Sequence, residues 1–595
     1  MSSDGVFRFT ANYLNGFQLQ PSQPEGPAFI VTGGSGCSGV DVGLNSSVVT
    51  NSYMLYFDGI YSGPTLPGTG SALDFGVQNA PGTYTVVATN ATTSTAGLMY
   101  GIATVYTPGV SIVTQPSSVT VVSNLPASFS VQALGASLTY QWYLNGTALT
   151  NGGNLSGVTT SNLTITASQD ADAATVSDGY TVVVQTPCGN IVTSSPPAAL
   201  TLTAPRNLVW VGGNPSMDWN LTDTNFSLSG NPSTFDQGDD VLFNDSSSYP
   251  SVTISNSVVA SLIVVGGTQG YSFMGPGVIT GVSQLMDTNT GTLTIGNPNS
   301  DGLSYNNYTG GTTVGAGATL QLGDGVSLYK VGTVGGVINV STGGTLNFNF
   351  LDNGGTVQLN NSLAGSGTVN VEDADGSIVA SQLSGVSSNF NGTINVMGTA
   401  ALHASDGNAG YALGNGATVN VPSGTQAWLD RSSTAYNDTF NISGTGWLGV
   451  SPQTGALRIF GSTVNGPVVL QANARVGGTI SGGTIQSVIS GPYQMEVWGT
   501  AGSYVLNLGP TNGMPQGYGS TLITSGSINA MNTNAISTGP LTLDLAGDLR
   551  LNGNNLTVSN LSSINSGQVT ITTGSTIRNN NSKVAATLLE IVTEG

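Results

Sequence analysis

The chain has 595 residues, of which 9 are Lys or Arg and 29 are Asp or Glu, giving a formal net charge of −20. That length exceeds what one hydrophobic core supports, so we expect several domains. So few cations exclude the clustered Lys and Arg that bind phosphate, and we expect neither nucleic acid nor an anionic membrane as a partner. No run of about 18 apolar residues occurs, so we expect no membrane insertion.

The composition is typical of an all-β protein outside the cell. Only 6% of the residues are charged and 38% are apolar, with Gly, Ser, Thr and Asn filling the difference. A chain of this kind could be disordered, but its β-branched residues alternate with polar ones instead of being scattered. We therefore expect an ordered protein that is extracellular or on a cell surface.

The two cysteines, Cys37 and Cys188, fall in different predicted domains. Their wide spacing disfavours a disulfide between them, and whether the thiols are free is left open.

Residues 1–28 form a separate N-terminal segment in which aromatic residues alternate before several prolines. One interpretation is an extended strand that docks on the first domain. The other is a donor strand that completes a neighbouring subunit, with Phe7, Phe9, Tyr13 and Phe17 as assembly residues.

Two β-sandwiches are predicted next, at residues 29–108 and 109–205. The first, with VDVGL and GTYTVVATN, resembles a secreted β-sandwich repeat of large bacterial surface proteins. The second has the pattern of an immunoglobulin-like domain. Trp142 stands where strand C carries its buried tryptophan, and Tyr180 stands where the tyrosine corner precedes strand F. Its predicted strand B has no cysteine, so packing has to replace the usual disulfide between the sheets.

A β-rich entry domain or cap is predicted at residues 206–300, a β-solenoid at 301–582 and a terminal strand with a tail at 583–595. The solenoid prediction rests on one repeated phrase, a small-residue turn followed by Thr-apolar-polar-apolar. Examples are GGTLNFNF, GSGTVNV, GTINV and GATVNV. Alternation with period two predicts strands with one buried face, and strands this short have to stack on each other to bury it.

Several of these phrases resemble those of bacterial proteins with autotransporter-associated (passenger-type) β-strand repeats. The matching elements are residues 210–213, Trp219 with Asn220, and residues 238–245, 310–323 and 551–563. The resemblance implies an extracellular right-handed β-helix. The departure is that residues 583–595 provide one short strand in place of a transporter barrel, and we expect Leu588, Leu589 and Ile591 to be assembly residues.

Two groups of acids are candidate sites. Asp236, Asp239 and Asp240, followed by Asp245, are interpreted as turn-capping residues, with a Ca²⁺ site as the alternative. Glu372, Asp373 and Asp375 are interpreted as a solvated turn. A polysaccharide-cleaving β-helix would instead need such acids to converge within about 5 to 9.5 Å of each other.

Other candidate chemistry is sparse. His403 is the single histidine, and although Ser405 and Asp406 follow it, a packing role is favoured over a triad. Arg431, Arg458 and Arg475 are interpreted as isolated arginines, or alternatively as a ladder that binds acidic sugars. For Trp428, Trp447 and Trp498, packing is favoured over a sugar-binding face.

We therefore predict an all-β protein with N-terminal immunoglobulin-like β-sandwiches followed by a long right-handed β-solenoid. Its expected function is structural and non-catalytic, as a self-assembling fibre or surface-coat subunit or an adhesin stalk. No cofactor is expected beyond the alternative of Ca²⁺. The expected partner is the protein itself, with surface glycans as a further candidate. The rival hypothesis is a polysaccharide-binding or polysaccharide-degrading β-helix.

Overall fold

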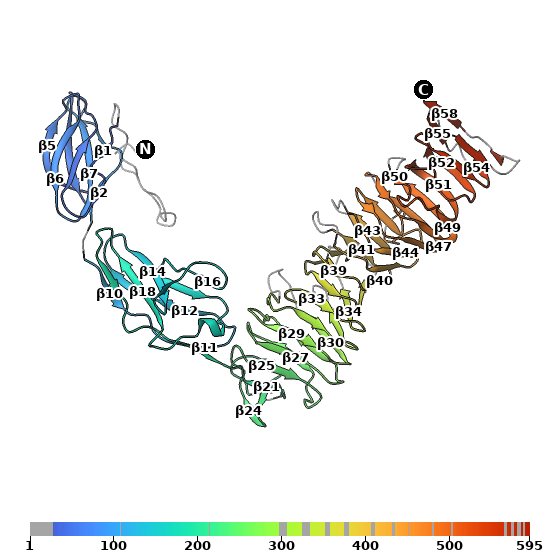
Figure 1. Ribbon diagram of the computed structural model, residues 1–595, viewed down its shortest axis with the longest axis horizontal. Helices are drawn as coiled ribbons and strands as arrows, with labels where there is room; N and C mark the ends of the chain where they lie inside the picture. Colours follow the sequence, from blue (N-terminus) through green and yellow to red (C-terminus); the bar gives the residue numbers. More distant parts are fainter. Residues whose placement is uncertain are drawn as a thin grey trace, which may run out of the picture. The chain divides into compact units, whose positions relative to one another are not determined.

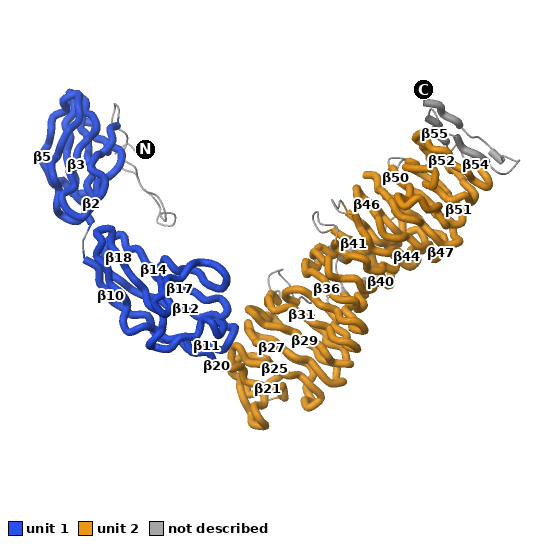
Figure 2. Tube along the Cα trace, viewed as in Figure 1, with its two compact units in different colours: residues 1–203 blue, residues 204–595 orange. Residues whose placement is uncertain are grey.

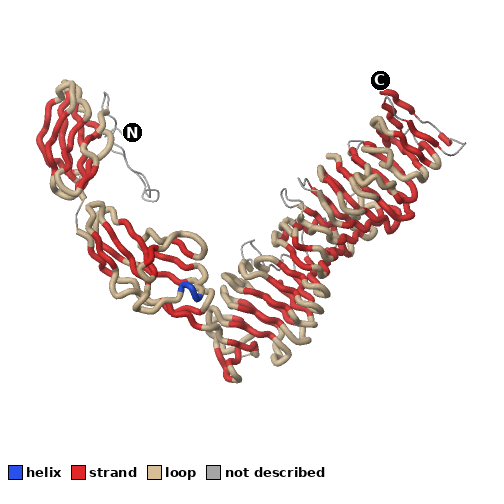
Figure 3. Tube along the Cα trace, viewed as in Figure 1, coloured by secondary structure: helices blue, strands red, loops and turns tan. Residues whose placement is uncertain are grey.

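The computed structural model describes residues 28–106, 109–213, 215–296, 306–323, 334–350, 357–373, 380–405, 411–430, 435–449, 451–478, 481–500, 504–564, 568–572, 576–579, 585–586 and 590–594. These residues are all-β, apart from 3-10 geometry such as the turn η1 (Asp170–Asp172), and form no α-helix (Figure 3). None of the described residues forms a helix that could cross a membrane. The chain divides into two compact units, residues 1–203 and 204–595 (Figure 2).

The first sandwich of unit 1 packs a three-stranded sheet, ordered β1-β3-β6, with a sheet ordered β2-β9-β7-β4-β5, in which β8 also pairs with β7. Its strands are β1 (Val31–Thr32), β2 (Ser35–Gly36), β3 (Val40–Leu44), β4 (Asn51–Phe57), β5 (Ile60–Pro67), β6 (Leu73–Gln78), β7 (Gly82–Asn90), β8 (Ala96–Leu98) and β9 (Ala103–Val105). Alternate residues of β4 and β7 point inward, so Tyr53, Leu55, Tyr84 and Val86 form a buried core.

The second sandwich has its own core and four small sheets. Its strands are β10 (Ser111–Thr114), β11 (Val119–Val122), β12 (Ala127–Ser130), β13 (Gln132–Leu134), β14 (Thr139–Leu144), β15 (Thr147–Ala148), β16 (Leu155–Ser156), β17 (Asn162–Ile165), β18 (Tyr180–Gln185), β19 (Ile191–Thr193) and β20 (Leu200–Thr203). Trp142 on β14 is fully buried. The Tyr180 hydroxyl donates a 2.7 Å hydrogen bond to the Asp172 carbonyl. Both immunoglobulin-like features are thus confirmed.

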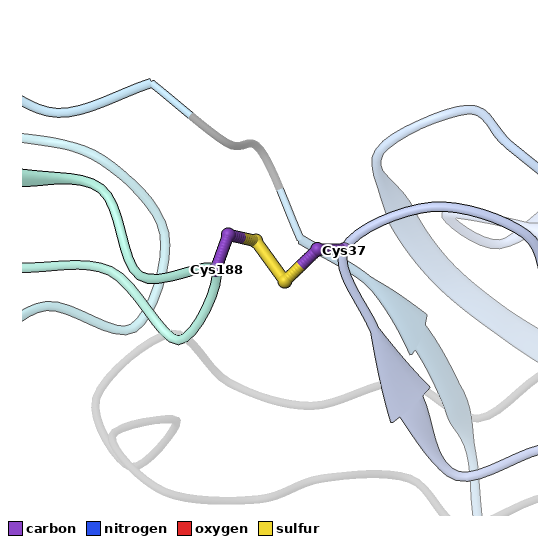
Figure 4. The surroundings of a disulfide bond; sticks show 2 residues. All are labelled: Cys37 and Cys188. Carbon is purple, nitrogen blue, oxygen red and sulfur yellow. A yellow bond between two sulfur atoms is a disulfide. The ribbon is translucent and has the colours of Figure 1, made fainter.

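A disulfide between Cys37 and Cys188 joins the two sandwiches (Figure 4). Cys37 follows β2 of the first sandwich, and Cys188 lies in the β18–β19 loop of the second. The expectation that the spacing disfavours this pair is wrong. Sequence separation does not measure distance, and loops of two adjacent sandwiches meet although 151 residues separate them.

Unit 2 contains the β-solenoid that the repeated phrase predicts (Figure 1), and its parallel strands already begin within residues 206–300, which we expected to form an entry domain or cap. Parallel strands build a ten-stranded and a 26-stranded sheet. The ten-stranded sheet contains, in order, β24 (Asn231–Ser233), β23 (Phe226–Leu228), β21 (Asn207–Trp210), β25 (Asp240–Phe243), β27 (Leu262–Val265), β29 (Gln284–Asp287), β31 (Thr312–Val314), β33 (Ile338–Val340), β36 (Leu363–Gly365) and β39 (Asn389–Phe390). The strands β23 and β24 pair antiparallel to β21 and each other, which covers the edge of the first parallel strand.

One column of the 26-stranded sheet runs the length of the solenoid, each strand pairing in parallel with the next coil. It consists of β22 (Asp218–Trp219), β26 (Ser251–Ile254), β28 (Tyr271–Met274), β30 (Thr292–Gly296), β32 (Thr319–Leu322), β34 (Thr345–Phe350), β37 (Thr368–Asp373), β40 (Thr393–Met397), β42 (Thr418–Val421), β44 (Thr439–Gly444), β47 (Val468–Gly478), β49 (Ile489–Gly499), β51 (Gly517–Ala530), β52 (Leu541–Arg550), β55 (Gln568–Thr572) and β58 (Glu590–Glu594).

The remaining strands form further faces of the later coils. They are β35 (Val357–Leu359), β38 (Ala380–Leu383), β41 (Ala401–Ala404), β43 (Gln426–Asp430), β45 (Leu457–Phe460), β46 (Thr463–Val464), β48 (Gly483–Ile485), β50 (Val505–Leu508), β54 (Leu561–Ile564) and β57 (Ala585–Ala586), together with the pair β53 (Asn555–Val558) and β56 (Thr576–Asn579).

A single hydrophobic cluster fills the solenoid from Leu208 to Leu561. The apolar positions of each Thr-apolar-polar-apolar phrase supply it, as with Ile394 and Val396 of β40. Large rings fill the first coils, where Trp219 lies within 5.4 to 5.5 Å of Phe235 and Phe243 between ring centroids. Inward residues thus stack coil upon coil, which is how short strands gain a common core.

Candidate functional site

The first acidic group is organised around Arg206. Its Nε and Nη2 donate hydrogen bonds to Asp239 Oδ1 at 2.8 Å and Oδ2 at 2.5 Å. Nη2 also lies 2.8 Å from Asp236 Oδ2. The Asp239 side chain is 2% exposed, whereas that of Asp236 is 68% exposed. A guanidinium therefore occupies the space between the two carboxylates, where a two-carboxylate mechanism would need sugar or water.

The remaining acids of this group face other partners. Ser261 and the backbone of Leu262 hydrogen-bond to Asp240, while burial raises its pKa. Asp245 accepts hydrogen bonds from the backbone N–H groups of Thr268 and Gln269, which lower its pKa and cap a turn of the next coil. No group of three His, Cys, Asp or Glu that could hold a metal occurs among the described residues. The Ca²⁺ interpretation of Asp236, Asp239 and Asp240 thus gains no support, and the cation beside the first two is Arg206.

The second acidic group does not form a described cluster. Glu372 lies on β37 in register with Asn349 and Met397 of the adjacent strands. Asp373 ends the same strand, and Asp375 lies outside the described residues.

His403 belongs to a stack that crosses three coils. It pairs in register with Trp428, which pairs with Arg458 on the other side. The imidazole lies parallel to the indole at 4.0 Å between centroids, and the guanidinium carbon of Arg458 is 3.9 Å from the indole centroid. Both faces of Trp428 are therefore covered. This favours coil-to-coil packing over sugar stacking.

Asp430 supports this stack from the side. Its Oδ2 is 3.2 Å from His403 Nε2. Burial lowers the pKa of His403, and Asp430 acts in the opposite direction. Asp406, the acid expected beside His403, lies outside the described residues, and so does Arg431.

The other tryptophans and arginines are also engaged within the solenoid. Arg475 Nη2 pairs with Glu496 Oε1 at 2.9 Å, and its guanidinium carbon lies 5.6 Å from the Trp498 ring centroid. Trp447 is buried. An arginine ladder that offers free cations to acidic sugars is therefore not formed by Arg458 and Arg475.

The sequence-predicted assembly residues Phe7, Phe9, Tyr13, Phe17, Leu588 and Leu589 lie outside the described residues. Ile591 lies on β58, where its backbone is in register with Val569 of β55. The described part of the C-terminal segment thus supplies β57 and β58, the last two strands in the order of the long sheet.

A feature that the sequence analysis missed is a ladder of amides on the outer face of the solenoid. Asn347, Asn370, Asn395, Asn420 and Asn441 occupy equivalent positions on five successive strands, β34, β37, β40, β42 and β44. Each Nδ2 donates to the Oδ1 of the preceding asparagine, at 2.9, 2.8, 2.8 and 2.7 Å. The signal was present in the sequence as Thr-apolar-Asn in each phrase.

The last four asparagines of this ladder line a groove of about 890 Å³. We call it the asparagine groove and define it by Asn370, Asn395, Met397, Asn420, Pro422 and Asn441. None of the described side chains that line it is charged. A column of threonines, Thr345, Thr368, Thr393, Thr418 and Thr439, lies two residues before the asparagines on the same outer face.

The comparisons with known proteins concern the immunoglobulin-like part. A chimeric titin Z1Z2 tandem is 19% identical, with 30% of this chain and 97% of that chain covered and a TM-score of 0.14. The titin tandem A164-A165 is 13% identical over 30% of this chain and 98% of its own, at a TM-score of 0.20. Four immunoglobulin domains of Sidekick-1 are 13% identical, with 33% of this chain and 52% of that chain covered and a TM-score of 0.22. These scores carry no functional argument. No protein-family model matches the chain, and no curated protein matches it.

Proposed function

We propose that this protein is an extracellular, non-catalytic structural protein, either a subunit of a fibre or surface coat or the stalk of an adhesin. The observation that carries the proposal is the continuous parallel ladder from β22 to β58 around one hydrophobic cluster. A solenoid whose coils share a core and a hydrogen-bonded ladder resists bending and stretching, which are the loads on a stalk or fibre.

The arrangement of the polar residues supports a mechanical role over a catalytic one. In the described part of the chain, Arg206, Arg458 and Arg475 contact acids or aromatic rings of neighbouring coils. These contacts tie one coil to the next. We therefore interpret these three arginines as residues that stabilise the stacking of one coil on the next.

The extracellular location and the relation to autotransporter-associated β-strand repeats belong to the same proposal. The Cys37–Cys188 disulfide favours an oxidising compartment, since such bonds persist there. The stacked Thr-apolar-polar-apolar strands are the architecture that the sequence resemblance implies, and the right-handed coil it implies stays a prediction.

Self-association completes the proposal and rests on the aromatic N-terminal segment at residues 1–28. Electron microscopy and light scattering of the full chain test it against a variant that lacks these residues. We expect assemblies of the full chain and a monomeric variant. If both proteins are monomeric at high protein concentration, self-assembly is contradicted. The interpretation as an adhesin stalk would then be the one that remains. Release of reducing sugar ends from a polysaccharide would contradict the non-catalytic role.

A further inference from the structure

We propose that the asparagine groove binds a neutral, linear polysaccharide that lies along the solenoid axis. This goes beyond the proposed mechanical function, because it assigns a ligand class to one outer face of unit 2.

Each asparagine amide of the ladder retains unused hydrogen-bonding capacity. A carboxamide has two N–H donors and an oxygen with two lone pairs. The ladder uses one donor and one lone pair between each pair of neighbours, as in the 2.8 Å bond from Asn420 to Asn395. One N–H and one lone pair per coil remain for a ligand. Hydroxyl groups both donate and accept, so a polyhydroxylated chain matches this surface.

The groove also offers apolar surface beside the amides. Met397 is 39% exposed and lies in register beside Glu372 of the preceding coil, while Pro422 lines the same groove one coil later. Specific small-molecule sites combine apolar surface with a few placed polar groups. A sugar ring has the same two characters, since its faces carry C–H groups and its edges carry hydroxyls.

The electrostatics favour an uncharged ligand. The described lining of the groove contains no charged side chain, and the whole protein has a net charge of −20. An acidic polysaccharide would be repelled by that net charge and would find no cation to pair with its carboxylates in the groove. Among the described lining residues no carboxylate would pair with a cationic polymer, and Glu372, in register with Met397, is the acid that borders them.

The spacing favours a linear repeating ligand. Neighbouring strands lie about 4.8 Å apart, so the amides recur at that interval along the axis. One sugar unit of an extended glycan is of similar length, so successive units meet successive amides. The volume of about 890 Å³ lies within the range of about 300 to 1,000 Å³ that is typical of ligand-binding clefts.

Affinity electrophoresis of the full-length protein tests the proposal. The gels contain soluble neutral polymers (hydroxyethyl cellulose, mixed-linkage β-glucan or galactomannan), or acidic ones (alginate or polygalacturonate). We expect retardation by at least one neutral polymer and by neither acidic polymer. No retardation by any neutral polymer, or equal retardation by acidic ones, would overturn the proposal.

Paired substitutions then locate the site. The variant Asn395→Thr/Asn420→Thr keeps β-favouring residues on the strands but removes two amides, and we expect binding at least about tenfold weaker. The matched control is Asn507→Thr/Asn529→Thr, which alters a second ladder with a 2.7 Å bond between these asparagines, outside the groove. Its binding should match the unaltered protein.

A single, milder substitution tests the same groove in case the double variant does not fold. Met397→Ala removes exposed apolar surface from the groove and leaves the ladder intact, so we expect weaker binding with an unchanged thermal transition. Unchanged binding in both groove variants, or equal loss in the control, contradicts the proposal.

Discussion

The sulfur atoms of Cys37 and Cys188 are bonded to each other and join a loop of the first sandwich to a loop of the second, across 151 residues. The chain also connects these sandwiches between β9 and β10. The disulfide is therefore a second connection between two domains with separate cores.

We expect removal of this disulfide to affect the connection between the sandwiches more than the sandwiches themselves. Each keeps its own buried core, so Cys37→Ser/Cys188→Ser should shift the thermal transitions little, although it opens a long loop. Cleavage between β9 and β10 by a protease should become faster, because the domains separate more freely. Limited proteolysis with mass spectrometry measures this. Equal cleavage rates with and without the disulfide would contradict this prediction.

The Arg206–Asp239 pair gives a second prediction. The Arg206→Ala substitution leaves the carboxylate of Asp239, which is 2% exposed, without its cation. Removing one partner of a buried ion pair lowers the free energy of unfolding by roughly 3 to 5 kcal/mol. Arg206 is partly exposed, so we expect a loss at the lower end of that range. Chemical denaturation measures the loss. The control is Asp236→Asn, which alters the 68% exposed partner of the same arginine and should cost little. Equal costs for the two substitutions would contradict the account.

A buried acid should make the stability of the solenoid depend on pH. Burial raises the pKa of Asp287 from 3.8 to about 7. The folded state therefore binds more protons than the unfolded state between about pH 4 and 7, and the free energy of unfolding falls as pH rises through that window. Asp438 acts in the same direction, because burial raises its pKa to about 6.

The substitution Asp287→Asn removes this contribution. The amide keeps an oxygen that can accept the hydrogen bond from the Asn289 N–H. We expect a higher melting temperature than the unaltered protein at pH 8, and a much smaller difference at pH 4. Calorimetry at both pH values checks this. A lower melting temperature for the variant at pH 8 would contradict the prediction.

The strands could be predicted from the sequence, but their partners could not. Alternation in GTINV and GATVNV predicts β40 and β42, and Trp142 and Tyr180 predict the immunoglobulin-like core. The amide ladder depends on which coils are neighbours. Its asparagines are separated by 23, 25, 25 and 21 residues, so no fixed period indicates that they stack.

Two other features, the disulfide and the partners of the acids at residues 236–245, could not be predicted for similar reasons. Sequence separation suggested that Cys37 and Cys188 lie apart, because the folded proximity of two loops leaves no local pattern. The acids of residues 236–245 were grouped by density along the chain. Side-chain direction instead places Asp239 against Arg206 and Asp245 against the turn of the next coil.

The central claim, that unit 2 stacks coil on coil in one register, is tested most directly by a distance across the threonine column. Thr292 and Thr439 are separated by six parallel steps through Thr319, Thr345, Thr368, Thr393 and Thr418. Double electron–electron resonance between spin labels on Thr292→Cys and Thr439→Cys measures it, since the native cysteines are paired in a disulfide. Six steps of about 4.8 Å predict a narrow distribution with backbone positions about 29 Å apart. A broad distribution, or one centred far beyond that distance, would contradict the account.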